Sequence, residues 1–267
     1  MLKDITLGQY FPGNTVVHRL DPRTKLLMVV VYIVALFLAK WWVSYGVMLA
    51  FLVTAVVLSR IKPKALFRGL KPLIVIMVFT ALINLFYSDG EVLVKFWIFR
   101  ITREGIVQAA FLVLRIMMLV TGTFLMTYTT SPIALTDGME SLLSPLKKLH
   151  FPVHELSMMM SIALRFIPTL IEETDKIISA QKARGADFES GNIFRRAKAL
   201  VPILVPLFVS AFRRADELAT AMECRCYHGG EGRTKLKQLH YCARDIITLL
   251  LGAALLGGII TLRCFGL

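Results

Sequence analysis

The chain has 267 residues, of which 56% are hydrophobic and only 18% are charged, and its mean hydropathy is +0.66. Soluble domains usually carry about 25% charged residues, so this composition predicts a membrane protein with a sizeable polar insert. The net charge of +13 comes mostly from residues 1–130, beside the predicted membrane segments, which indicates membrane topology and anionic-lipid contact and argues against nucleic-acid binding.

The chain opens with an amphipathic lead, residues 1–25, that is not a cleavable signal peptide, because the first apolar run starts only at Leu26. Residues 26–39 are uncharged but few, and we expect a first span there because flanking lysines can snorkel and extend its reach. Residues 41–59 predict a second span that begins with an interfacial aromatic belt.

The next loop, residues 60–71, is short and purely basic, which places it and the amino terminus in the cytoplasm by the positive-inside rule. Residues 72–88 predict a third span, which ends on the outer side. We expect residues 92–104 to form an outer interfacial segment, and residues 105–130 to form a fourth span back to the cytoplasm.

Residues 131–245 never offer twenty uncharged residues in a row, so we expect this region to stay on the cytoplasmic side. Within it, Pro145 predicts a kink or early end for a short helix at 137–149. Residues 246–262 predict a last span, in which Ala253 and Ala254 each precede a glycine by four positions, a spacing that allows close helix packing.

The predicted fold is therefore an all-α polytopic membrane protein with about five transmembrane helices and a cytoplasmic insert of long helices. Its expected parts are a cytoplasmic lead (1–25), a four-span bundle (26–130), the cytoplasmic helical region (131–245) and a final transmembrane helix (246–267).

Two long amphipathic helices dominate the insert, at residues 155–185 and about 194–227. Each carries one apolar stripe at three- and four-residue spacing. We expect the two stripes to bury each other and to leave both helix ends free for other contacts.

Each of these helices ends on an arginine between small residues, as Ala183-Arg184-Gly185 and as Cys224-Arg225-Cys226. A cation near a helix carboxyl end is stabilising by about 0.3–1 kcal/mol, but lysine would serve that purpose equally well. Small flanking residues let a guanidinium enter a narrow slot and form bidentate hydrogen bonds. The pattern therefore favours docking onto a partner over simple capping.

No catalytic motif is present: the sequence has no phosphate-binding Gly-x-x-x-x-Gly-Lys-Ser/Thr loop, no His-Glu-x-x-His helix and no Gly-x-Ser-x-Gly elbow. We therefore expect a non-catalytic chain. A zinc site is the competing hypothesis for its soft ligands, with ordinary semi-buried thiols as the simpler explanation, and we expect no metal. The residues concerned are Cys224, Cys226, His228, His240 and Cys242.

Arg115 lies ten residues into the fourth predicted span. An arginine at membrane depth is a candidate functional residue. We favour the alternative that the span begins later and that the side chain snorkels outward, because residues 116–136 are uncharged and long enough to cross alone.

Three stretches carry a resemblance to a known family: residues 8–25 with His18-Arg19-Leu20-Asp21-Pro22-Arg23-Thr24-Lys25, residues 180–188 around Arg184, and residues 221–227 around Arg225. The chain resembles the transmembrane T component of energy-coupling factor transporters, which are vitamin and metal-ion importers of the ATP-binding-cassette class. The resemblance covers nearly the whole chain.

The resemblance implies a coupling subunit whose two arginine motifs, at Arg184 and Arg225, dock on two ATPase subunits that bind ATP and Mg. It also implies that the long helices cradle a separate substrate-binding membrane protein, the S component, in the cell membrane. The second motif departs from the family pattern through Cys224 and Cys226. Cysteine is still small, so docking is expected to survive; its closeness of fit and thiol sensitivity stay open.

The same helices supply the expected platform for the S component, and a Met-rich surface suits interchangeable partners because it can repack. The platform residues are Met159, Met160, Phe166, Ile167, Leu204, Phe208 and Phe212. The alternative function is a stand-alone secondary transporter, which would need paired acids or broken helices at membrane depth. The acids of this chain all lie at or outside the predicted span ends.

Overall fold

A computed structural model describes residues 10–87, 92–96, 99–149, 151–186, 188, 193–229 and 238–265. The chain forms two compact units. We call Gly8–Gly138 together with Leu239–Leu267 the membrane unit, and Met139–Gln238 the insert unit.

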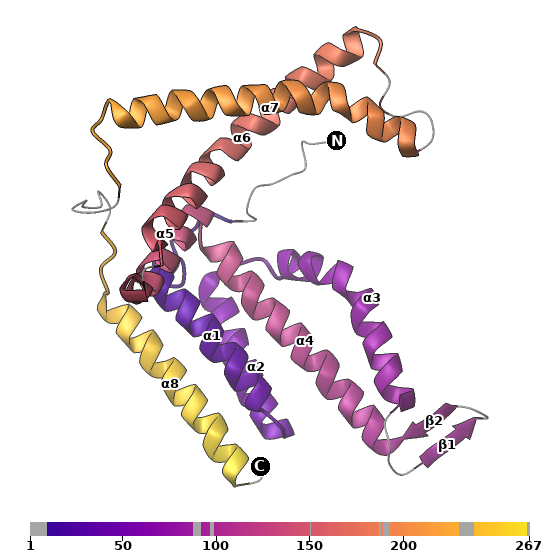
Figure 1. The fold of residues 1–267 in the computed structure, drawn as a ribbon. Coiled ribbons are helices and arrows are strands. Elements are labelled where there is room, and N and C mark those ends of the chain that lie inside the picture. The colour runs from indigo at the N-terminus through magenta and orange to yellow at the C-terminus, as the bar shows by residue number, and fades with distance from the viewer. Residues whose placement is uncertain are drawn as a thin grey trace. The chain divides into compact units, whose positions relative to one another are not determined.

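The membrane unit is built mainly from helices that the sequence predicted (Figure 1). Among the described residues, four helices are long and apolar enough to cross a membrane: α2, α3, α4 and α8. The helices are α1 (Pro22–Leu38), α2 (Trp42–Ser59), α3 (Pro63–Tyr87), α4 (Arg103–Thr129) and α8 (Ala243–Cys264).

The predicted first span is the helix that falls short. α1 has 17 residues, which at about 1.5 Å per residue gives about 25 Å, less than the roughly 30 Å hydrocarbon core. The structure thus supports four of the five predicted spans by length and composition. α3 also begins earlier than predicted, at Pro63, because Pro72 is accommodated inside the helix, so that three basic residues of the predicted loop, Lys64, Arg68 and Lys71, belong to the helix.

A two-stranded antiparallel hairpin stands where the sequence predicted an outer interfacial segment and an all-helical fold. β1 (Val92–Phe96) pairs with β2 (Phe99–Thr102), with Val94 opposite Ile101 and Phe96 opposite Phe99. Valine, isoleucine and phenylalanine favour strands, and the segment is too short to compete as a stable helix. The fold is otherwise helical, as predicted.

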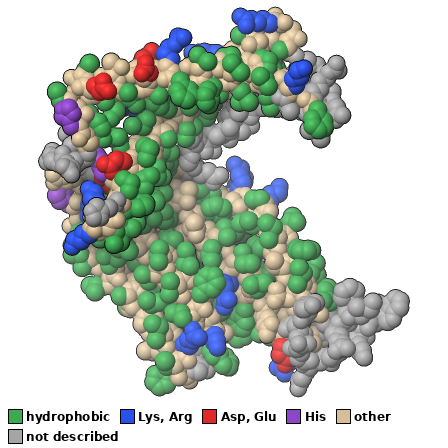
Figure 2. Space-filling view, in the orientation of Figure 1, with side chains coloured by type: hydrophobic (Ala, Val, Ile, Leu, Met, Phe, Trp, Pro, Cys, Tyr) green, Lys and Arg blue, Asp and Glu red, His purple; other side chains and the backbone are tan. Residues whose placement is uncertain are grey.

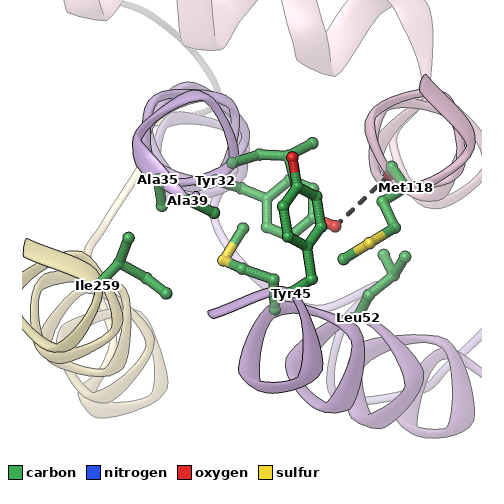
Figure 3. Packing of buried hydrophobic residues seen from close by; sticks show 9 residues of the cluster. Tyr32, Ala35, Ala39, Tyr45, Leu52, Met118 and Ile259 are labelled. Atoms are coloured by element: carbon green, nitrogen blue, oxygen red, sulfur yellow. Dashed lines mark hydrogen bonds between the residues drawn. The ribbon is translucent and has the colours of Figure 1, made fainter. Parts of the chain in front are cut away.

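The core of the membrane unit lies around α1 (Figure 3). Ala35 and Leu36 are fully buried there, and Ile259 of α8 is equally buried. The Tyr32 hydroxyl donates to the carbonyl of Met118 on α4 at 3.5 Å. α1 therefore packs against α4 and α8, and it belongs to the bundle although it is short.

Glycines set how closely these helices approach. A Cβ on Gly122 of α4 would lie 2.8 Å from the Tyr32 ring, and one on Gly252 of α8 would collide with Met28 of α1. The small-residue face predicted on α8 is different: Gly257 and Gly258 have no neighbour within 4 Å. Within the described residues Gly252 makes the close approach on α8, and close packing at the Gly257–Gly258 face stays a prediction.

The insert unit contains two 31-residue helices, α6 (Val153–Ala183) and α7 (Ile193–Glu223), which cross one another (Figure 1). They agree with the two long helices predicted from periodicity. Before them, α5 (Pro132–Leu143) ends in a 3₁₀ turn, η1 (Ser144–Leu149), at the site where Pro145 predicted a kink.

Candidate functional site

The tip of α6 presents Arg184 as the residue that caps the helix. The amide of Gly185 donates to Lys182 O at 2.9 Å, and the amide of Ala186 donates to Gln181 O at 3.0 Å. These two bonds form a Schellman motif, in which the residue after the cap adopts a left-handed conformation. Gly185 has φ of +86°, which glycine adopts without strain.

The tip of α7 repeats this geometry around Arg225. The amide of Cys226 donates to Glu223 O at 2.8 Å, and that of Tyr227 donates to Met222 O at 3.1 Å. Cys226 occupies the left-handed position with φ of +56°, which a side chain disfavours by about 1–2 kcal/mol. Both tips thus end in the same motif, and only the first has the residue best suited to it.

The shared cap explains part of the small-residue pattern around both arginines. The residue after each arginine must adopt a positive φ, so glycine is favoured there for a backbone reason, independent of any slot on a partner. Arg184 and Arg225 are both exposed, and neither forms an ion pair within the described residues. Docking through these two arginines stays a prediction that this geometry permits.

A charged contact holds α6 and α7 together where they cross. Glu173 of α6 accepts hydrogen bonds from the Ser210 hydroxyl and from Arg214 Nη2 of α7, the latter at 3.0 Å. The Arg214 guanidinium also lies over the Phe166 ring, 6.0 Å from its centre. The Glu173–Arg214 ion pair is partly exposed, and solvent screens it, so it contributes little to the free energy of unfolding. Its main effect is to fix the orientation of α6 relative to α7.

A second contact follows from a proline inside α7. Pro206 has no amide hydrogen, so the carbonyl of Pro202 lacks its usual partner four residues later in the helix. Gln181 of α6 donates its Nε2 hydrogen to that carbonyl at 3.2 Å. Gln181, which completes the hydrogen bonding of the Pro202 carbonyl, lies three residues before Arg184 and so links the α6 tip to α7.

The expected mutual burial of the two apolar stripes is wrong for α7. Ile203 is 6% exposed, whereas Leu204, Phe208 and Phe212 are 58%, 66% and 63% exposed. Figure 2 shows hydrophobic side chains gathered along α7. Periodicity identifies an apolar face but not the surface that covers it, and α7 is apolar on more than one side. We call the exposed set the α7 stripe: Leu200, Val201, Leu204, Val205, Phe208 and Phe212.

The predicted platform residues differ in exposure. Met159 and Met160 of α6 are 53% and 46% exposed, which leaves both apolar side chains accessible to a partner. Phe166 and Ile167 are half-buried. Their contact with a partner stays a prediction, and the larger accessible apolar surface of the insert unit is the α7 stripe.

The zinc hypothesis receives no support from the described residues, among which no three His, Cys, Asp or Glu side chains gather as metal ligands would. All four cysteines are free and exposed. Cys226 is held by backbone geometry at the α7 tip, as described above.

The amino-terminal lead (residues 10–25) forms a polar network at the start of α1. Asp21 caps α1 by accepting from the Arg23 amide at 2.9 Å, and its own amide donates to Asp245 of α8 at 2.8 Å. Asp245 is 2% exposed and also accepts from the Cys242 amide at 2.8 Å. Two helix starts are therefore capped jointly by two buried acids.

Lys25 ties the same network to α4. Its ammonium donates to the carbonyl of Thr129 at 2.8 Å and to that of His18 at 3.2 Å, and it is buried within electrostatic reach of Asp21 and Asp245. The Arg23 guanidinium, with its Nε 3.6 Å from Asp21 Oδ1, is the second cation, so two basic side chains lie beside the two acids of this cluster.

His18 completes the lead as a neutral side chain. Its Nε2 hydrogen is donated to the carbonyl of Phe11 at 3.1 Å, and its Nδ1 lies 2.6 Å from the Thr15 hydroxyl. Burial lowers the pKa of His18 from its usual 6.5, the Phe11 carbonyl raises it, and the nearby Lys25 charge lowers it further. The lead is therefore fixed by its own hydrogen bonds at neutral pH.

Arg115 is a structural residue of the membrane unit. Its Nε donates to the Tyr45 hydroxyl at 2.9 Å, and its Nη2 donates to the carbonyl of Ala39, the residue that ends α1, at 3.4 Å. The guanidinium also lies 5.7 Å from the centre of the Phe37 ring. The side chain therefore joins α4 to the turn between α1 and α2, which the sequence places on the outer side, and a later start of the fourth span stays a prediction.

Sequence reasoning identified the lead as a motif but missed its function. Asp21-Pro22 is a recognisable helix start, with a capping acid followed by proline in the first helical turn. The partner Asp245 lies 224 positions away in the chain, and no local pattern could assign it.

These features define a class of protein: a polytopic helical membrane protein that presents two arginine-tipped helices and an exposed apolar stripe. Residues 13–236 match the family model described as CbiQ, cobalt transport protein.

Curated relatives agree over nearly the full length of the chain. A protein of Thermosediminibacter oceani is 53% identical over 262 residues, covering 98% of this chain and 99% of the relative. One of Acidaminococcus fermentans is 55% identical over 255 residues (96% and 95%), and one of Bacillus subtilis is 50% identical over 260 (96% and 98%). Each is named energy-coupling factor transporter transmembrane protein EcfT. This chain belongs to that family, which confirms the resemblance found in its sequence.

Proposed function

We propose that this chain is the coupling subunit of an energy-coupling factor importer. It transmits the ATP-driven motion of two ATPase subunits to a separate substrate-binding membrane subunit, for uptake of vitamins or other micronutrients. The chain itself is non-catalytic and binds no cofactor; ATP and Mg belong to the partner ATPases. It lies in the plasma membrane with its amino terminus in the cytoplasm.

The observation that carries this proposal is the repeated tip geometry. Arg184 and Arg225 each cap a 31-residue helix through the same Schellman motif, and both guanidiniums are exposed. A rigid helix with a fixed cap can deliver a planar, bidentate donor to a carboxylate on another protein. Two equal tips suit two ATPase subunits.

The α7 stripe supports the second half of the proposal. Its exposed valine, leucine and phenylalanine side chains, together with Met159 and Met160, form an apolar surface that remains accessible among the residues that the structure describes. Exposed patches of this kind usually mark protein or membrane contacts. A membrane-embedded substrate subunit is the partner that we assign to it.

The test is a mild-detergent purification of the tagged chain from its native membrane. We expect two ATPase subunits and a small membrane protein to accompany it. The Arg184→Ala/Arg225→Ala pair is expected to lose the ATPases, because removing one partner of a buried charge pair costs about 2–5 kcal/mol at each tip.

The matched control is Lys176→Ala/Arg213→Ala, which removes the same charge from exposed positions of the same two helices. It should retain both ATPases. Retention of both by the Arg184/Arg225 variant would contradict docking at the tips. A chain that purifies alone in every case would contradict the coupling function and favour a stand-alone secondary transporter.

A further inference from the structure

Arg225 is not alone at its end of the insert unit. A cavity of about 350 Å³ lies between α6 and α7 beside the Arg225 tip. Its walls are one turn of α6 and two turns of α7, at three- and four-residue spacing along each helix. The lining residues are Ile162, Arg165, Phe166, Leu218, Ala221, Met222 and Arg225.

The cavity has an apolar floor and a basic rim. The half-buried residues Ile162, Phe166, Leu218 and Met222 form the floor, whereas Arg165, Ala221 and Arg225 are exposed at the rim. Arg214 lies over Phe166 and is itself paired with Glu173, so this aromatic floor residue is held in place.

The two rim arginines lack an internal counter-charge. Within the described residues neither Arg165 nor Arg225 forms an ion pair, in contrast to Arg214 at the crossing. Two guanidiniums that line one small apolar cavity repel each other unless an anion lies between them. The low-dielectric floor would strengthen their attraction for such an anion.

We propose that this cavity receives an ATPase subunit through an aliphatic side chain flanked by carboxylates, and that Arg165 is a second docking residue beside Arg225. The aliphatic group fills the apolar floor, and the carboxylates accept from the two guanidiniums, one supplied by each helix. This rests on the proposed function and deepens it, because it makes the Arg225 tip a two-helix site.

The proposal also distinguishes the two tips. Arg184 lies at the end of α6 with an exposed guanidinium, and the described residues that line the cavity do not include it. Arg165 is therefore coupled to docking at Arg225 and independent of docking at Arg184. Because α6 contributes to both sites, its displacement by one ATPase would be felt at the other.

The test measures how many ATPase subunits each variant retains, by native mass spectrometry of the purified complex. Arg165→Gln should lower the ratio of ATPase to chain from two toward one, with at least about tenfold weaker binding at that site. Combined with Arg225→Ala it should cause little further loss. Combined with Arg184→Ala it should remove both ATPases.

Arg213→Gln is the matched control, since Arg213 is an exposed arginine of α7 outside the cavity. A second pair separates packing from charge: Ala221→Leu fills the cavity, whereas Ala219→Leu makes the same change at an exposed position of α7 that does not line it. Only Ala221→Leu should weaken retention.

The outcomes distinguish this inference from the proposed function. If Arg165→Gln and Ala221→Leu both retain two ATPase subunits while the Arg184→Ala/Arg225→Ala pair loses them, docking in the cavity is contradicted. The proposed coupling function then still stands. Full retention in the double tip variant, or no ATPase on the unmodified chain, overturns both.

Discussion

Charged side chains are treated in opposite ways in the two units of this molecule. In the membrane unit, Asp21, Lys25 and Asp245 are buried and satisfy one another and nearby backbone groups. In the insert unit, Arg184 and Arg225 are exposed at helix ends without ion pairs among the described residues. The first arrangement completes a bundle, and the second leaves donors available to another protein.

Apolar side chains follow the same division. Around α1 the bundle buries Leu36 and Ile259 completely, whereas α7 leaves most of its stripe accessible and buries Ile203. Accessible apolar residues on α2, α3 and α8 are expected in a bundle that faces lipid. The stripe lies instead on α7, which is not among the described helices apolar enough to cross a membrane, and a protein surface is the counterpart that we propose for it.

The largest effect is expected from a substitution in the buried charge cluster of the membrane unit. Asp245→Ala removes a buried carboxylate that accepts from the amides of Asp21 and Cys242 and lies near Lys25. Leaving these groups unpaired is expected to lower the free energy of unfolding by about 3–5 kcal/mol. Thermal unfolding of the detergent-purified chain measures the loss.

Asp216→Ala serves as the control, because Asp216 is an exposed acid on α7. Its unfolding midpoint should stay close to that of the unmodified chain. If both variants unfold at the same temperature, the acid pair at the helix starts is not a joint cap.

A smaller effect is expected from Arg115→Gln, which tests whether a charged residue in a membrane span is structural. The variant loses the bond to the Ala39 carbonyl and weakens that to Tyr45, for an expected cost of about 1–3 kcal/mol. Uptake should fall only in proportion to the amount of folded chain in the membrane.

Arg103→Gln removes the same charge at the exposed start of α4 and should leave both quantities unchanged. A normal amount of folded Arg115→Gln protein without uptake would contradict the structural role and return Arg115 to the list of functional residues.

Sequence reasoning predicted these helices and their charged ends because periodicity and charge are local properties of the chain. The length of α7 and the arginine at its tip were both predicted from the order of residues alone. The partner of Asp21 and the contact of Arg115 with Ala39 were not, because 224 and 76 positions separate the residues. The exposed side of α7 was also beyond prediction, since an apolar face does not specify what covers it.

The strand pairing of the hairpin β1–β2 was not predicted, for a different reason. A short apolar segment with aromatic residues suits a membrane interface whether it is a helix or a strand, and composition cannot choose between the two without knowledge of the neighbouring strand. The positive φ of Cys226 was likewise hidden, since cysteine carries no turn preference.

The smallest expected effect sharpens the contrast between the two tips. Cys226→Gly should relieve the strain of a left-handed cysteine, and it adds some backbone freedom in the unfolded chain, for a net local gain of about 0.5–1 kcal/mol. Amide hydrogen exchange at the last turn of α7 should slow by about two- to fivefold.

Cys224→Gly, inside the final helical turn, should instead speed this exchange, because glycine costs about 1 kcal/mol there. Cys226→Ala removes the thiol but keeps the strain, so its exchange should match that of the unmodified chain. Equal exchange rates in the Cys226→Gly and Cys226→Ala variants would show that residue 226 does not adopt a strained left-handed conformation. The two helix tips would then not share the same capping motif.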